Sequence, residues 1–312
     1  MKFFELIPTD THIDFIGKFR YFMVLSLIIL ACVVFGAFTK GFNFGVDFTG
    51  GTVVQAKFTN PTSADDVRKL LGELGDTTAS AVAVGQDNRE YLITTRTVST
   101  DKNAIPLNQR LTQKLGPSQI AILSVDIVGP KVGSELKWAA IRSLFYSIVL
   151  ITIYIWFRFD IRFAPGATIA MIHDLLVVSG FYLFTGKEFT ITAIAALLTI
   201  AGYSVNDTIV IYDRVRELLK TSGQAIPLPQ VINHAINLTL SRTILTALAT
   251  LLAVIPIAIW CTDEIKDFAE AMLIGIFVGI YSTVYIASPF TIYVEKWLEK
   301  RNKNTQRAPA TA

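Results

Sequence analysis

The sequence predicts a polytopic α-helical membrane protein with six transmembrane helices and an external α+β domain between the first and the second helix. Three observations support this fold class. Of the 312 residues, 52% are hydrophobic and 17% are charged, whereas a soluble domain carries about 25% charged residues. Six apolar runs are long enough to cross a bilayer, which takes about 20 residues. One long polar stretch, residues 39–137, has the pattern of a small mixed domain.

The first apolar run, residues 19–38, follows a short polar arm, residues 1–18. A secretory signal peptide is the competing interpretation. Its apolar region would span about 7–15 residues and end at a small-residue cleavage site. This run is longer, and the residues around Phe38, Thr39 and Lys40 offer no such site. We therefore expect an uncleaved transmembrane helix, and the polar arm favours a separate chain over a piece of a fusion.

The polar stretch, residues 39–137, alternates strand and helix patterns. Segments rich in β-branched residues lie at 51–58, 80–84, 91–98 and 119–128, and helical patterns lie at 63–75 and 107–115. Ser63, with Asp66 three residues later, is typical of a helix start. The order β-α-β-β-α-β is that of the ferredoxin-like fold. We predict a four-stranded antiparallel sheet with two helices on one face, and we expect the chain to leave the membrane at Gly50 and Gly51, since glycines allow a tight turn.

The five remaining transmembrane helices are expected within residues 138–294. Their apolar runs are residues 138–157, 164–184, 189–212, 243–260 and 268–294. Residues 213–241 are expected to form a polar loop, in which residues 231–240 make an amphipathic helix at the membrane surface. The tail, residues 295–312, is basic and then low in complexity, so no regular structure is expected there.

The distribution of basic residues predicts the orientation. Fourteen Lys and Arg residues of the N-terminal arm, two loops and the tail fall on one side, against Lys187 and Lys266 in the short loops of the other. Loops rich in Lys and Arg stay in the cytoplasm. Both termini are therefore predicted to be cytoplasmic and the ferredoxin-like domain external.

Ionisable residues within or at the edge of the apolar runs are the candidate functional residues. Asp207 lies about two turns before the fourth run ends, and Arg242 opens the fifth from the same side. Consecutive helices are antiparallel, so the two should lie at similar depth and form an ion pair. Separation of that pair would let the carboxylate take up a proton, which is the behaviour of a proton relay. A static structural ion pair is the alternative.

Asp174 lies about ten residues into the third run, with His173 beside it. A carboxylate at this depth is costly, so such residues usually face the bundle interior and carry function. We expect its partner to be His173 or a backbone carbonyl. Glu270, near the outer end of the sixth run, is interpreted as a residue of the membrane interface.

Polar and small residues recur every four positions on three of the predicted helices. The three stripes are Thr199–Tyr203–Asp207, Arg242–Thr246–Thr250 and Ala271–Gly275–Gly279–Thr283–Ala287. Small residues at this spacing let helices approach closely. Gly275 and Gly279 are therefore candidate helix-packing residues, against either another helix of this chain or a partner.

Enzymatic and metal-binding functions find no support in the sequence. Two membrane aspartates suggest an intramembrane aspartyl protease, but the chain has no GxGD sequence. It also has no HExxH sequence and no phosphate loop. Its two cysteines and three histidines have no metal-ligand spacing, so neither a metal nor a cofactor is expected. A net charge of +3 is too small to argue for nucleic acid.

Five motifs together closely resemble those of the SecD/SecF family of protein-export membrane proteins, within the resistance-nodulation-division superfamily. They are GVDFTGG (45–51), VGPKVG (128–133), HD (173–174), GYSVNDTIVIYDRVRE (202–217) and LTLSRTILTALAT (238–250). The resemblance extends from about residue 15 to residue 294. It marks as structural motif residues Gly45, Asp47, Phe48, Gly50, Gly51, Gly129 and Pro130.

The resemblance implies a six-helix protein of the bacterial cytoplasmic membrane with an external ferredoxin-like domain. It implies that Asp207 and Arg242 take part in proton conduction, with an aspartate of SecD opposite them, and Asp174 joins them as a candidate. The implied protein is a subunit of the SecDF complex that uses the proton-motive force to promote export of unfolded polypeptide. Its implied partners are SecD, the SecYEG channel and YajC. A passive scaffold subunit and a proton-coupled small-molecule exporter are the alternatives.

Overall fold

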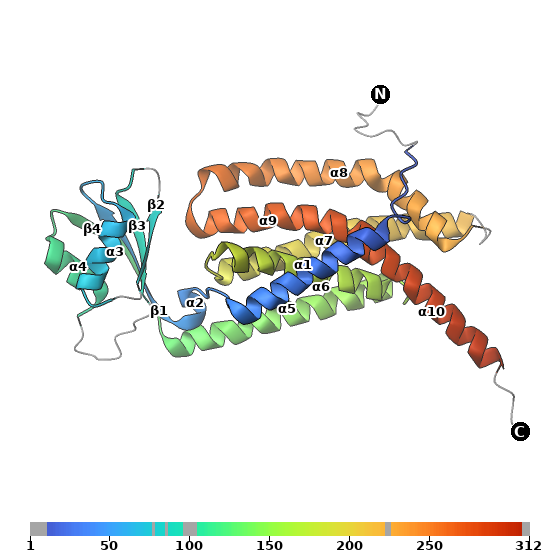
Figure 1. Ribbon diagram of the computed structural model, residues 1–312, viewed down its shortest axis with the longest axis horizontal. Helices are drawn as coiled ribbons and strands as arrows, with labels where there is room; N and C mark the ends of the chain where they lie inside the picture. Colours follow the sequence, from blue (N-terminus) through green and yellow to red (C-terminus); the bar gives the residue numbers. More distant parts are fainter. Residues whose placement is uncertain (1–10, 77–78, 85–86, 96–104, 222–225, 308–312) are drawn as a thin grey trace, which may run out of the picture.

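Figure 1 shows the computed structural model, in which a bundle of long helices carries a small α+β domain at one end. The structure describes residues 11–76, 79–84, 87–95, 105–221 and 226–307. Within these residues, six helical segments are long and apolar enough to cross a membrane, which confirms the predicted number. They are α1 (Phe19–Thr39), α5 (Pro130–Arg158), α6 (Ala164–Thr185), α7 (Ile191–Thr221), α8 (Leu228–Trp260) and the continuous segment of α9 (Asp263–Ser282), η1 (Thr283–Ala287) and α10 (Ser288–Arg307).

The six segments form a bundle with an interior and an outer layer. Helices α6, α7 and α9 lie inside, where more than half of their most apolar stretches are buried, whereas α1, α5 and α8 expose most of theirs. Alanines contribute much of the interior, among them Ala167, Ala196 and Ala271. Small side chains let the inner helices approach closely, and the outward apolar faces suit a lipid or protein environment.

Several helices extend further than their apolar runs. Helix α7 continues to Thr221 and α8 already begins at Leu228, so the polar loop expected at residues 213–241 is wrong for most of its length. The amphipathic helix expected at residues 231–240 is the first part of α8, where Val231 and Ala235 are buried. Helix α10 continues to Arg307, although no regular structure was expected after residue 294.

The external domain has the predicted order β1 (Gly51–Phe58), α3 (Ala64–Glu73), β2 (Ser80–Val84), β3 (Glu90–Thr95), α4 (Leu107–Leu115) and β4 (Ile120–Val128). The sheet order is β2-β3-β1-β4 with antiparallel neighbours. Leu71 of α3 and Leu111 of α4 pack on the same sheet face as Val54 and Ile93, in a core separate from that of the bundle. The ferredoxin-like prediction is confirmed, except that residues 96–98 of the third expected strand lie outside the described residues.

The predicted start of the first helix in this domain is also confirmed. The Ser63 hydroxyl accepts a hydrogen bond from the backbone N–H of Asp66 at 3.2 Å, which caps the first turn of α3.

A joint of residues 43–51 and 129–133 connects the domain to the bundle. Helix α1 ends at Thr39, one residue beyond the predicted apolar run, and the chain then passes through the short helix α2 (Val46–Thr49). Gly50 has a φ of +74°, and a Cβ there would lie 3.0 Å from Pro130 Cα. A Cβ on Gly133 would lie 3.0 Å from the Gly50 nitrogen. The GVDFTGG and VGPKVG motifs therefore pack against each other, and glycine is required where the backbones meet.

The joint is also bonded to the loop between α6 and α7 and to the first residue of α7. The Gly45 N–H donates to the Phe189 carbonyl at 3.0 Å, and the Phe189 N–H donates to the Asn43 carbonyl at 2.7 Å. Asp47 Oδ2 accepts from the N–H of Ile191, the first residue of α7, at 3.0 Å. Phe48 is buried beside Phe189. The external domain is thus attached to the helix that carries Asp207.

Candidate functional site

Asp207 lies on the interior side of α7 and is 4% exposed. Its carboxylate makes no hydrogen bond and no ion pair within the described part of the chain. A buried carboxylate without a partner is costly, by several kcal/mol if it carries its charge. Asp207 is therefore a group whose environment responds strongly to its protonation.

Arg242 lies on the neighbouring helix α8, but the expected ion pair is not formed: no guanidinium nitrogen comes within 4.0 Å of the Asp207 carboxylate. The Arg242 charge acts on Asp207 through space only. The buried stripe of α8 contains Thr239, Thr243 and Ala247, so Arg242, one position away, is exposed. Sequence indicates the depth of a residue in the membrane, but the rotation of α8 about its axis depends on packing.

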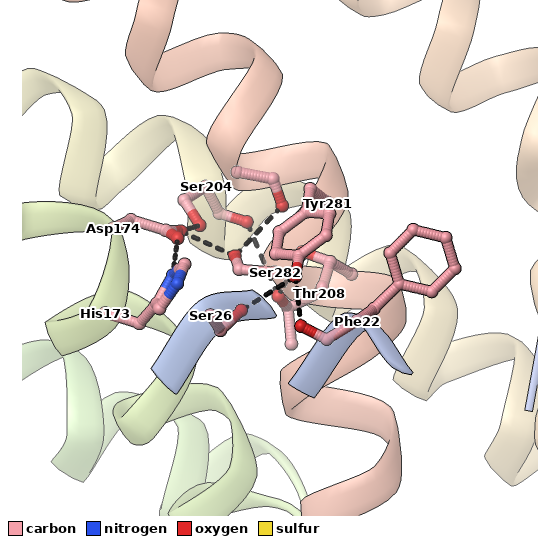
Figure 2. Close-up of polar contacts among 10 residues, drawn as sticks. Phe22, Ser26, His173, Asp174, Ser204, Thr208, Tyr281 and Ser282 are labelled. Atoms are coloured by element: carbon pink, nitrogen blue, oxygen red, sulfur yellow. Dashed lines mark hydrogen bonds and ion pairs between the residues drawn. The ribbon is translucent and has the colours of Figure 1, made fainter. Parts of the chain in front are cut away.

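Asp174 is fully buried at the centre of the bundle and is held by three side chains (Figure 2). Its Oδ1 lies 2.9 Å from His173 Nδ1, which confirms His173 as one of the two partners predicted for Asp174. Its Oδ2 accepts hydrogen bonds from Ser204 Oγ of α7 at 2.5 Å and from Ser282 Oγ of α9 at 2.7 Å. Three donors offset much of the cost of burying a carboxylate. Asp174 therefore joins α6, α7 and α9.

The arrangement also indicates the tautomer of His173. Its Nε2 is buried and has no hydrogen-bond partner within the described residues. A proton on Nδ1 is used in the bond to Asp174, whereas a proton on Nε2 would be a buried donor without an acceptor. The His173 tautomer with its proton on Nδ1 therefore leaves no buried N–H without an acceptor.

Further polar contacts surround Asp174 (Figure 2). Ser26 of α1 donates to the Tyr281 hydroxyl at 2.7 Å, and that hydroxyl donates to the Phe22 carbonyl at 2.5 Å. The hydroxyls of Thr208 and Thr283 lie 2.9 Å apart. The π-helical segment η1 begins at Thr283, directly after Ser282. Such segments inside α-helices are frequent at functional sites. Sequence reasoning missed Ser204 and Ser282, because serine in an apolar run gives no signal of its own.

The small-residue stripe of α9 packs within this chain, against α7. A Cβ on Gly275 would lie 2.5 Å from Ile200 side-chain atoms, and one on Gly279 would lie 3.2 Å from Ser204 Cβ. The close approach at Gly279 is what brings Ser204 and Ser282 to the same carboxylate oxygen. In the second stripe, the Thr246 and Thr250 hydroxyls bond to carbonyls of their own helix.

Glu270 lies outside the central cluster. It forms an ion pair of 2.8 Å with Lys187, which also pairs with Asp267. These contacts connect the α6–α7 loop to α9 at the end of the bundle that carries the ferredoxin-like domain. The described residues contain no group of three or more His, Cys, Asp or Glu side chains that could hold a metal ion.

Comparisons with known proteins identify two family models that match different stretches of the chain. Residues 108–297 match the family described as "Protein export membrane protein SecD/SecF, C-terminal", and residues 35–62 match the "SecD/SecF GG Motif". The latter match contains Gly50 and Gly51 of the joint.

Curated relatives resemble the chain over nearly its full length. The protein translocase subunit SecF of Calditerrivibrio nitroreducens is 39% identical over 303 residues, which cover 96% of this chain and 99% of the relative. The protein translocase subunit SecDF of Thermus thermophilus is 36% identical over 297 residues, which cover 94% of this chain and 39% of the relative.

Solved structures resemble the fold as well. A crystal structure of SecDF, described as a translocon-associated membrane protein from Thermus thermophilus, has a TM-score of 0.82 at 35% identity over 94% of this chain. A SecDF structure in a super-membrane-facing form has a TM-score of 0.70 at 34% identity over 95% of this chain. This chain spans 40% of the length of each of these two structures.

Proposed function

The chain belongs to the SecD/SecF family of protein-export membrane proteins, and we propose that it acts as the SecF subunit of a protein translocase. It promotes export of unfolded polypeptide across the bacterial cytoplasmic membrane with energy from the proton-motive force. One proton crossing 100 mV supplies about 2.3 kcal/mol, enough to bias a domain rearrangement. The family consists of transport proteins, so the protease hypothesis is dropped.

The proposed partners follow from the relatives. The name SecDF indicates a single chain that contains both SecD and SecF. This chain matches about 40% of the length of SecDF. We therefore expect SecD to pack against this chain, with SecYEG and YajC as further members of the assembly. The outward face of α8 suits a protein partner, because it exposes Arg242 together with Leu245, Leu248 and Leu252. The excess of basic residues supports cytoplasmic termini and an external ferredoxin-like domain.

The observation that carries the proposal is the buried carboxylate of Asp207 near a cation on the next helix. Protonated, Asp207 is neutral and stable in its apolar surroundings. Ionised, it attracts the Arg242 guanidinium, so α7 and α8 shift relative to each other. Uptake from one side of the membrane and release to the other make a cycle of two helix arrangements. Asp174 is proposed as a second member of this pathway, with a smaller share because its carboxylate is already bonded.

Export of a reporter into membrane vesicles, with and without a proton gradient, tests this function. Asp207→Asn keeps the size of the side chain but fixes the neutral state, so the gradient-stimulated part of export should be abolished. Arg242→Leu should also abolish the gradient-stimulated part of export, because ionised Asp207 then has no cation on α8 to attract. Asp213→Asn is the matched control, since Asp213 lies on the same helix but pairs with Arg158 at the exposed end. A gradient response of Asp207→Asn equal to that of the parent would favour the scaffold alternative.

A further inference from the structure

The external end of α5 carries a charged hollow that the export cycle does not use. The hollow has a volume of about 350 Å³ and is lined by Ser134, Glu135, Trp138 and Arg142. Arg142 and Glu135 are exposed and make no ion pair within the described residues. The Arg142 Nε–H donates only to the Trp138 carbonyl of its own helix, at 3.2 Å.

The position of the hollow relative to the bilayer follows from two tryptophans of α5. Trp138 and Trp156 are 60% and 54% exposed, and 18 residues separate them, about 27 Å along the helix. Tryptophans are enriched at both edges of a hydrocarbon core of about 30 Å. Trp138 thus marks the outer edge. Arg142 lies one turn inside it and Glu135 about one turn outside.

A charge on the membrane face of a helix requires a counter-group. Helical side chains tilt towards the N-terminus, which in α5 is the external end, so the Arg142 guanidinium reaches the headgroup layer. Lipid phosphates lie in that layer, next to the acyl chains, and bind guanidinium groups through charge-assisted hydrogen bonds. Glu135, about 10 Å further out along the axis, would repel a purely anionic headgroup.

We propose that this hollow binds a zwitterionic phospholipid with a primary ammonium group, phosphatidylethanolamine, in the outer leaflet. The phosphate binds Arg142, and the ammonium group, which lies further from the acyl chains, pairs with Glu135. The order of the two charges along α5 thus matches that of the headgroup.

A lipid fits this face better than a protein partner. In Figure 1, α8, the helix proposed to face SecD, forms one edge of the bundle, and α5 forms the opposite edge. One face of α5 packs against the bundle core through Leu136, Ala140 and Leu144. Arg142 lies on the opposite face of the helix. Only a small part of its most apolar stretch is buried in the chain.

Native mass spectrometry of the full chain tests the proposal. The protein is delipidated in mild detergent and incubated with phosphatidylethanolamine, phosphatidylcholine and phosphatidylglycerol of identical acyl chains. We expect the parent to retain phosphatidylethanolamine preferentially. Arg142→Ala should reduce its binding about tenfold, the effect of losing a charge-assisted hydrogen bond. Lys131→Ala removes the same charge from an exposed position of α5 outside the hollow and should bind lipid as the parent does.

Glu135→Gln gives the second test and preserves the helix even if Arg142→Ala proves unstable. It should abolish the preference for phosphatidylethanolamine over phosphatidylglycerol while keeping binding of a phosphate headgroup. The proposal fails if the parent prefers phosphatidylglycerol or if Arg142→Ala retains phosphatidylethanolamine unchanged. It also fails if Arg142→Ala weakens SecD co-purification without changing lipid binding, because the hollow would then be a protein interface.

Discussion

The two buried aspartates of the bundle differ in how their charge is compensated. Asp174 accepts hydrogen bonds from Ser204 and Ser282 and contacts His173 (Figure 2). Asp207 makes no such bond within the described residues. Protonation of Asp174 would weaken three existing contacts, whereas protonation of Asp207 would break none. We therefore assign the larger proton-coupled effect to Asp207 and the larger structural effect to Asp174.

Replacement of the Asp174 donors tests this difference. Ser282→Ala removes one hydrogen bond to a buried charge and should lower the free energy of unfolding by about 1.5–3 kcal/mol. Asp174→Asn should lower it by at least as much, yet leave part of the gradient response of export. Thermal unfolding in detergent measures the first effect. Ser179→Ala is the control, because the Ser179 hydroxyl bonds to a carbonyl of its own helix. If Ser282→Ala and Asp174→Asn were both as stable as the parent, the structural role of Asp174 would be excluded.

At the scale of residues, the sequence indicated which groups are unusual, but it predicted only one of the contacts that they make, that of Asp174 with His173. Asp174, Asp207 and Arg242 stand out because ionisable side chains are rare in apolar runs. The other two partners of Asp174, Ser204 of α7 and Ser282 of α9, lie 30 and 108 residues further along the chain. Those contacts depend on how each helix is rotated about its axis. The same rotation decides that Asp207 and Arg242 form no ion pair.

At the scale of elements, the contact between α7 and α9 depends on two glycines. Gly275→Ala would put a methyl group 2.5 Å from Ile200, so we expect a loss of about 1–3 kcal/mol in stability from overpacking. Gly202→Ala on α7 is the matched control, since a Cβ there meets nothing within 4 Å. It should keep or raise the melting temperature, because alanine favours the helix. Equal melting temperatures for the two variants would exclude a packing role for Gly275.

Hydropathy predicted how many helices cross the membrane but not where they end. Apolar runs report the part of a helix that contacts lipid, and a helix continues beyond it wherever packing supports it. Val231 and Ala235 are buried in the first turns of α8. Asn233 and Asn237 of the same turns bond to the backbone of Ile13 and thereby hold the N-terminal arm. No hydropathy window contains that information.

At the scale of the whole molecule, the proposed orientation is open to direct labelling. With Cys32 and Cys261 replaced by serine, single cysteines at Asp87 and Lys300 report the external domain and the C-terminal helix. An impermeant maleimide added to intact cells should modify the first and not the second, because the basic residues hold the C-terminal side in the cytoplasm. Modification of position 300 from outside would contradict the proposed orientation.

Asp47 connects the two halves of the proposed mechanism. Proton movement at Asp207 promotes export only if it reaches the external domain, and α7 leads from one to the other. The first N–H of α7, that of Ile191, donates to Asp47 of the joint, and Asp207 lies 16 residues further, about 24 Å along the same helix. A displacement of α7 therefore acts on the segment that enters β1 at Gly51.

Asp47→Ala should uncouple the external domain from the bundle. It leaves the first turn of α7 without its acceptor, at a cost of about 1 kcal/mol, which a folded membrane protein tolerates. Gradient-stimulated export should fall well below that of the parent, while Asp207 and Arg242 remain intact. Asp47→Asn keeps an oxygen for the Ile191 N–H and should retain most of the response. The export assay in vesicles measures both variants, with their amounts in the membrane as the control. If Asp47→Ala exports as well as Asp47→Asn under a gradient, the external domain must receive the motion of the bundle by another route, such as the contact of Gly133 with Gly50.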